Sequence, residues 1–82
     1  MRLRAEFEFS LGAASDIVYR SVLPELGDQM LRSRVELVKR DDLLELMIES
    51  EDFTAMRAAL NSTLRLMRIA CELGRPHVLN TI

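Results

Sequence analysis

Hydrophobic and polar residues alternate in three segments of this chain, which predicts three strands with one buried face each. The first, at about residues 2–9, places apolar and charged side chains at strictly alternating positions. The second and third, at about 34–40 and 43–50, are separated only by Asp41 and Asp42, a polar turn short enough for a hairpin.

Two other segments, at about residues 11–23 and 51–73, repeat their apolar residues every three or four positions, which predicts helices. Ser10 stands where a side chain can cap the first helix, and Pro24 ends it. Acidic residues precede the second helix, where the positive end of the helix dipole favours them, and Gly74 follows as a stop.

The element order β-α-β-β-α predicts an α+β fold, a two-layer sandwich in which a three-stranded antiparallel sheet carries both helices on one face. We expect one domain over residues 1–82, with 74–82 as a tail. The other sheet face has charges of both signs, which suit either solvent or sheet-edge pairing in a dimer. These residues are Arg2, Arg4, Glu6, Glu8, Arg34, Glu36, Arg40, Glu45 and Glu49. A chain this short buries only about 60% of its unfolded surface, so oligomerisation or complex formation would stabilise it.

The second helix is more apolar than packing on one sheet requires. With 100° per residue, its apolar residues form two stripes, whereas one packed face needs a stripe of roughly 100°. The stripe of larger side chains is expected to cover the sheet: Phe53, Met56, Leu60, Leu64 and Met67. The stripe of smaller side chains, with Ser62 beside it, is expected to accept a helix of a partner: Ala55, Ala58, Ala59, Leu66 and Ile69.

A polar edge lies between these stripes, where Arg57, Asn61, Arg65 and Arg68 fall within an arc of roughly 80°. Guanidinium groups this close together can bind phosphates. Asn61 and Ser62 are poor helix formers in mid-helix, which favours a contact role for both. A solvated face, or pairing with carboxylates of the sheet or of a partner, would explain the same arginines.

Composition and motifs exclude most forms of catalysis. The net charge is −2, and the basic residues are ten arginines and one lysine. The single cysteine, Cys71, and the single histidine, His77, have no companion at metal-ligand spacing. The three glycines are scattered, so no phosphate-binding loop is present. No apolar run approaches the ~20 residues of a membrane span. We therefore expect a soluble, cytoplasmic protein without catalytic residues, metal or cofactor.

The long helix resembles the signature of the Pcc-type small subunit of the KEOPS complex, in the CTAG/Pcc family. That signature is an acidic helix start followed by Arg-Ala-x-x-Asn-Ser. Its residues here are Asp52, Arg57, Ala58, Asn61 and Ser62. Residues 17–25 also resemble the family's first helix, which ends in Pro-Glu, and the strand that begins near residue 33 fits as well. The resemblance covers about residues 4–73.

The resemblance implies a fold similar to a KH domain but without its Gly-x-x-Gly clamp, which this chain also lacks. It implies a non-catalytic subunit that forms homodimers, docks through its helices onto the threonylcarbamoyl-transferase subunit, and assists tRNA binding for threonylcarbamoyl-adenosine formation at position 37. The alternatives are a stand-alone KH-like RNA-binding module, a purely structural dimer without RNA contact, and a paralogous subunit with another role. Aromatic residues make up only 5% of the chain, so RNA contact would rest on arginines rather than base stacking.

Overall fold

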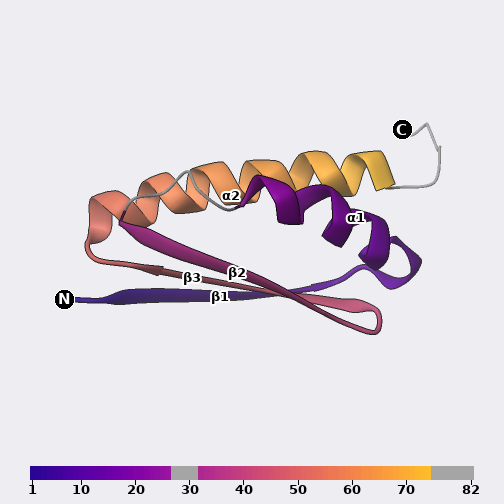
Figure 1. The fold of residues 1–82 in the computed structure, drawn as a ribbon, viewed down its shortest axis with the longest axis horizontal. Coiled ribbons are helices and arrows are strands. Elements are labelled where there is room, and N and C mark those ends of the chain that lie inside the picture. Colours follow the sequence, from indigo (N-terminus) through magenta and orange to yellow (C-terminus); the bar gives the residue numbers. More distant parts are fainter. Residues whose placement is uncertain (27–31, 75–82) are drawn as a thin grey trace.

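A three-stranded sheet forms one layer of the protein and two helices form the other (Figure 1). The computed structural model describes residues 1–26 and 32–74. The strands are β1 (Leu3–Ser10), β2 (Ser33–Arg40) and β3 (Leu43–Ser50), and the helices are α1 (Ser15–Val22) and α2 (Phe53–Gly74). Two short 3-10 turns, η1 (Gly12–Ala14) and η2 (Leu23–Glu25), flank α1. The predicted α+β fold class is confirmed.

The sheet has the order β1-β3-β2, with both neighbouring pairs antiparallel. The hairpin turn places β2 beside β3, and the segment containing α1 carries the chain from β1 to the far edge of the sheet. Leu46 at the centre of β3 lies opposite Phe7 of β1 and Leu37 of β2. Because side chains alternate along each strand, this register gathers the apolar residues on the face below the helices.

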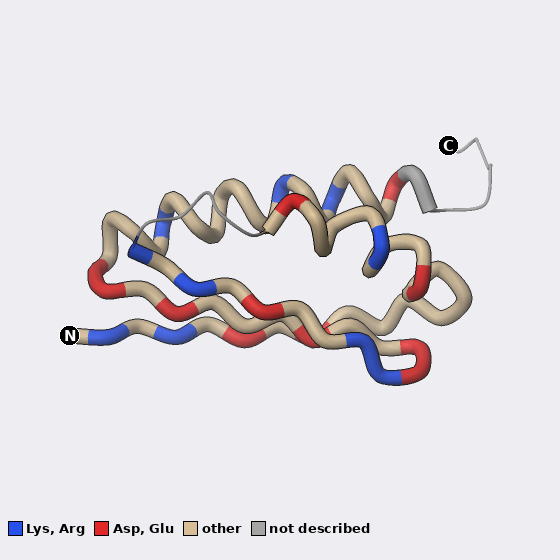
Figure 2. The backbone as a smooth tube through the Cα atoms, in the orientation of Figure 1, with Lys and Arg blue, Asp and Glu red and all other residues tan. Residues whose placement is uncertain are grey.

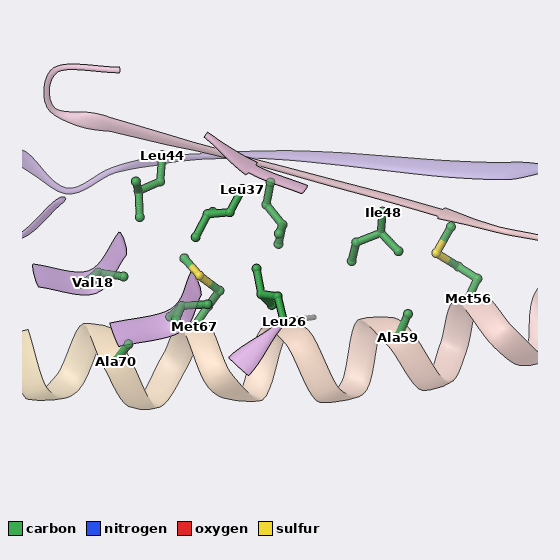
Figure 3. Packing of buried hydrophobic residues seen from close by; sticks show 11 residues of the cluster. Val18, Leu26, Leu37, Leu44, Ile48, Met56, Ala59, Met67 and Ala70 are labelled. Atoms are coloured by element: carbon green, nitrogen blue, oxygen red, sulfur yellow. The ribbon is translucent and has the colours of Figure 1, made fainter. Parts of the chain in front are cut away.

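The hydrophobic core fills the space between the sheet and the helices (Figure 3). Leu44, Leu46 and Ile48 of the central strand are at most 1% exposed. From the helix layer, α1 contributes Val18 and Val22. The longer α2 contributes Met56, Ala59, Met67 and Ala70. Burial of each large aliphatic side chain stabilises the fold by about 1.5–3 kcal/mol, so the core residues of β3 hold the two layers together.

The two helices begin differently from each other, and only one start matches the prediction. Ser10 is the last residue of β1 rather than a helix cap, because Gly12 turns the chain with φ +59° before α1 begins. The residue before α1 is Ala14, and no side chain caps the helix there. By contrast, Asp52 caps α2: its Oδ1 accepts a hydrogen bond from the backbone N–H of Ala55 at 2.8 Å.

The face of α2 that covers the sheet is shifted from the predicted stripe. Met56 and Met67 are buried as predicted, and Leu60 and Leu64 are half-buried. The prediction that Phe53 covers the sheet is wrong, because this first residue of the helix is 68% exposed.

Ala59, predicted to meet a partner helix, is fully buried within the core of the fold. Its small side chain lets α2 approach the layers below closely. Ile17 of α1, which has core spacing in the sequence, is 49% exposed. The expected tail lies outside the described residues, apart from Gly74 at the end of α2.

Replacing Thr63 by Val is expected to stabilise the protein by about 1 kcal/mol, because Thr63 is 0% exposed and its hydroxyl has no hydrogen-bond partner among the described residues. Valine keeps the shape, has a similar helix propensity and removes the desolvated hydroxyl. Thermal unfolding should show a Tm rise of about 4–8 °C. The matched control Thr54→Val, at an exposed position of the same helix, should leave the Tm nearly unchanged. A lower Tm for Thr63→Val would contradict this account.

Candidate interaction surface

The outward half of α2 runs along the longer of the two helices, which has 22 residues against 8 in α1. The buried residues of α2 are spaced three or four positions apart and lie along the inward side of the helix. They are Met56, Ala59, Thr63, Met67 and Ala70. Two adjoining edges remain on the other side, each covering an arc of roughly 80° by the helical repeat. The arginine edge consists of Arg57, Asn61, Arg65 and Arg68. The small edge consists of Ala55, Ala58, Ser62, Leu66 and Ile69.

All four side chains of the arginine edge are exposed. The blue segments of α2 in Figure 2 mark where its arginines lie along the helix. Within the described residues, Arg57 and Arg65 form no ion pair or hydrogen bond. Arg68 lies 3.6 Å from Glu72, one helical turn away. An exposed pair of this kind contributes little to stability. The sheet carboxylates therefore do not neutralise Arg57 or Arg65, and both guanidinium groups can bind an anion outside the fold.

The small edge combines exposed and half-buried side chains. Ala58 and Ser62 are exposed, Ala55 and Leu66 are half-buried, and Ile69 is 48% exposed. Of the residues predicted to contact a partner helix, only Ala59 is buried in the core. An apolar edge with small residues at its centre allows the backbone of another helix to approach closely.

Two further apolar side chains of the helix layer are exposed, although the helical spacing of one of them, Ile17, favoured burial. Ile17 is 49% exposed, and Leu23 in η2 is 43% exposed. Leu23 comes directly before Pro24, where the helical repeat ends. The position of this proline in the sequence could have indicated that Leu23 lies outside the buried face of the helix. The exposed apolar surface of the helix layer therefore includes α1 and η2 as well as α2.

The opposite, outer face of the sheet is covered with charged side chains. Glu49 of the central strand lies between Arg4 and Arg34, its partners on the two neighbouring strands. Its carboxylate is 3.5 Å from Arg4, 3.6 Å from Arg2 and 4.0 Å from Arg34. The carboxylate side chain is only 15% exposed, so these arginines stabilise a largely covered negative charge.

Next to this cluster the outer face forms an open hollow of about 510 Å³. Four carboxylates, those of Glu6, Glu8, Glu36 and Glu45, line it together with Arg4 and apolar side chains. In the parts of the chain that the structure describes, no group of three or more histidine, cysteine, aspartate or glutamate residues is arranged to hold a metal ion. Over the same residues, no helix is long and apolar enough to cross a membrane.

Comparisons with known proteins address the fold and the family. The model of a protein family described as transcription factor Pcc1 matches residues 2–74. A search of curated proteins gave no match. Among solved structures, a chain of the crystal structure of the binary complex Gon7-Pcc1 is similar, with a TM-score of 0.68 and 14% sequence identity. The similarity covers 89% of this chain and 90% of that chain. At this identity the structural match shows a common fold.

Proposed function

Because this chain belongs to the Pcc1 family, we propose that it is a non-catalytic assembly subunit of a KEOPS-type complex. In this role it docks onto the threonylcarbamoyl-transferase subunit, forms a homodimer, and assists tRNA binding for threonylcarbamoyl-adenosine formation in the cytoplasm. The observation that carries the proposal is the outward half of α2, which joins an apolar edge to a basic one. One helix then serves both a protein and a nucleic acid.

The small edge supports docking through helices. Exposed Ile69 offers an apolar anchor, and Ala58 and Ser62 leave room for a neighbouring helix. Anchors of this kind carry most of the binding energy in protein interfaces. The solved structure named Gon7-Pcc1 is a binary complex, so a chain of this fold is found paired with another protein there.

The arginine edge supports contact with tRNA. Arg57 and Arg65 are exposed and have no carboxylate partner within the described residues, so their charge is available to phosphates. Planar guanidinium groups bind phosphate oxygens in pairs of hydrogen bonds. Because the chain has a net charge of −2, such contacts depend on this local edge rather than on the field of the whole chain.

Co-elution with the threonylcarbamoyl-transferase subunit tests the assembly role. The two purified proteins are mixed and separated by size exclusion, and tRNA modification is measured for the transferase subunit and its kinase partner with and without this chain. We expect a joint peak and higher activity when the chain is present. Separate peaks together with unchanged modification would overturn the proposal.

Reversing two charges of the arginine edge, with Arg57→Glu and Arg65→Glu in one chain, is expected to weaken tRNA retention by the assembled complex about tenfold or more at low salt. Each lost phosphate contact should also reduce the slope of log K against log salt by about one. The matched control is Arg20→Glu with Arg40→Glu, two exposed arginines on α1 and β2, which should bind tRNA as the wild type does.

Filter binding of tRNA to the complex, over a salt series, measures both effects. Equal retention by the arginine-edge variant and the wild type at low salt would remove these residues from RNA binding and favour a purely structural subunit. Retention by the isolated chain as strong as that of the whole complex would instead favour a stand-alone RNA-binding module.

A further inference from the structure

We propose that the exposed ring of Phe53 stacks on an unpaired base of the bound RNA, while Arg57 binds a phosphate of the same nucleotide. This contact rests on the tRNA binding of the proposed function and extends it from phosphates to a base. Because aromatic residues make up only 5% of the chain, the sequence predicted contacts by arginines alone. The structure changes this expectation, since it places one aromatic ring in solvent at the end of the arginine edge.

Phe53 differs from the other aromatic residues of the chain in its exposure. It is the first residue of α2 and is 68% exposed. The other three aromatic residues, Phe7, Phe9 and Tyr19, are half-buried and pack against the core. Within the described residues, the ring of Phe53 stacks on no other aromatic ring, whereas Phe7 and Phe9 stack on each other. The ring of Phe53 is therefore available to a flat partner from outside the chain.

The neighbour of Phe53 on the helix surface is an exposed guanidinium group. Isolated exposed apolar side chains are common on proteins, so the ring by itself would indicate no ligand. Arg57 follows Phe53 by four residues, which places it one turn farther along α2 and roughly 40° around it. Side chains at this spacing are neighbours, with Cβ atoms about 5–6 Å apart. Arg57 is exposed and forms no ion pair or hydrogen bond within the described residues.

An aromatic ring beside a guanidinium group matches the two parts of a nucleotide. Every base has a π-face that stacks on aromatic side chains, and guanidinium groups bind phosphate oxygens. Only the sugar separates a base from its phosphate, so one nucleotide can contact both Phe53 and Arg57. The base has to be unpaired, because single-stranded loops and ends are where RNA bases are free to stack on a protein.

The position of Arg65 gives the RNA strand a path along α2. Arg65 lies about 12 Å beyond Arg57 along the helix axis, on the same edge, and is also exposed. A strand whose base stacks on Phe53 can therefore continue toward the C-terminal end of α2, where Arg65 binds the phosphate of another nucleotide. Stacking thus takes place at one end of a line of basic groups, an arrangement that single-strand-binding proteins use.

The acidic residues before Phe53 determine on which side of the ring the RNA backbone passes. Arg32 lies 3.7 Å from the carboxylate of Glu51 and also contacts the carboxylate of Asp52. One guanidinium group does not balance two carboxylates, and the side chain of Glu51 is 73% exposed. A phosphate is therefore repelled at the start of the helix and attracted by Arg57, one turn later.

The surroundings of Phe53 favour a nucleotide over a helix of a partner protein. By the helical repeat, the small edge lies at least about 140° around α2 from Phe53, so a helix docked there does not cover the ring. The exposed residues within four positions of Phe53 are all polar, namely Glu51, Thr54 and Arg57. The centre of a protein interface is depleted of charged residues, whereas a stacked base needs only the ring and a cation for its phosphate.

Replacing Phe53 by Leu tests the stacking contact, because leucine is apolar and favours the helix but has no π-face. Filter binding of a tRNA transcript to the assembled complex should show an affinity about fivefold lower or more for Phe53→Leu. The matched variant Phe53→Trp keeps a π-face and should bind at least as well as the wild type. A blunt-ended RNA duplex, which has phosphates but no unpaired base, should bind equally to all three proteins.

The salt dependence of binding distinguishes the ring from the guanidinium group. Stacking neutralises no phosphate, so Phe53→Leu should lower the affinity by the same factor at every salt concentration. Arg57→Gln should instead reduce the slope of log K against log salt by about 0.7, the value for one phosphate of a single strand. As an independent measurement, ultraviolet cross-linking of tRNA to the wild-type complex, followed by mass spectrometry, should identify a nucleotide attached to Phe53.

The outcomes separate the stacking contact from the proposed function. Equal tRNA affinities for the wild type and Phe53→Leu, with no cross-link at Phe53, would overturn stacking, while weaker retention by the variant with Arg57→Glu and Arg65→Glu would still support RNA binding by the arginine edge. Loss of co-elution with the transferase subunit in Phe53→Leu would place the ring in the docking surface and would also overturn stacking. Unchanged tRNA retention in all these variants would overturn both the stacking contact and the RNA role of α2.

Discussion

Replacing Ile69 by Lys should abolish co-elution with the threonylcarbamoyl-transferase subunit while the chain stays folded. Ile69 is 48% exposed, so lysine can extend its amino group into water in the free chain, and lysine is a good helix former. In a helix-to-helix interface the same position would hold a desolvated charge without a partner. Loss of an apolar anchor and burial of such a charge together cost roughly 2–4 kcal/mol, which corresponds to a loss of affinity of about 30- to 1,000-fold.

Val38→Lys is the matched control for this prediction. Val38 is also β-branched and 42% exposed, but it lies on β2, on the outer face of the sheet. Size exclusion and calorimetric titration should show unchanged binding for Val38→Lys and almost none for Ile69→Lys, with equal thermal unfolding. The reverse result, binding by Ile69→Lys and none by Val38→Lys, would place the docking surface on the sheet instead.

Alternating patterns in the sequence were sufficient to predict the sheet, because a strand with one buried face has only one way to place its side chains. The alternation of β3 places Leu44, Leu46 and Ile48 toward the helices, and the structure confirms this. The short turn between β2 and β3 determined their pairing. Asp41 adopts φ 52° there, a conformation that aspartate tolerates better than most residues.

The buried face of α2 was harder to predict, because the helix has two apolar stripes and the helical repeat does not say which one faces the sheet. Phe53 lies at the start of the helix, where it remains 68% exposed despite its position in the larger stripe. Ala59 belongs to the smaller stripe and is buried, because α1 shares the layer with α2 and close packing favours small side chains. These outcomes depend on the placement of other elements, which a local pattern does not contain.

The candidate site, too, could be predicted from the sequence only in part. The helical repeat predicted that Arg57 and Arg65 lie together on one edge, and the structure places both there, exposed. The helical repeat did not predict that these arginines lack a carboxylate partner within the described residues, because pairing depends on where the sheet carboxylates lie relative to α2. Those carboxylates alternate along the strands with the residues that pack against the helices, so they lie on the outer face of the sheet. Figure 2 shows the strands and the helices as separate layers.

Replacing Leu46 by Ala is expected to cause the largest loss of stability that a single substitution in this chain produces, about 2–5 kcal/mol. Leu46 is 1% exposed and stands at the centre of the central strand, with Phe7 and Leu37 on either side. The substitution removes buried methyl groups and leaves a cavity between the layers. A domain of this size is stable by roughly 4–12 kcal/mol in total, so much of the native population would be lost at moderate denaturant concentrations.

Urea unfolding at a fixed protein concentration measures the effect, and the midpoint should fall by about 1–3 M. Met47→Ala is the matched control, because Met47 is the next residue of β3 and points to the half-exposed outer face. Its truncation removes a side chain of similar size without opening the core, so its midpoint should shift much less. Equal shifts for the two variants would mean that the helices do not cover the centre of the sheet, and the two-layer packing that places the arginine edge and the small edge on the outside would then be wrong.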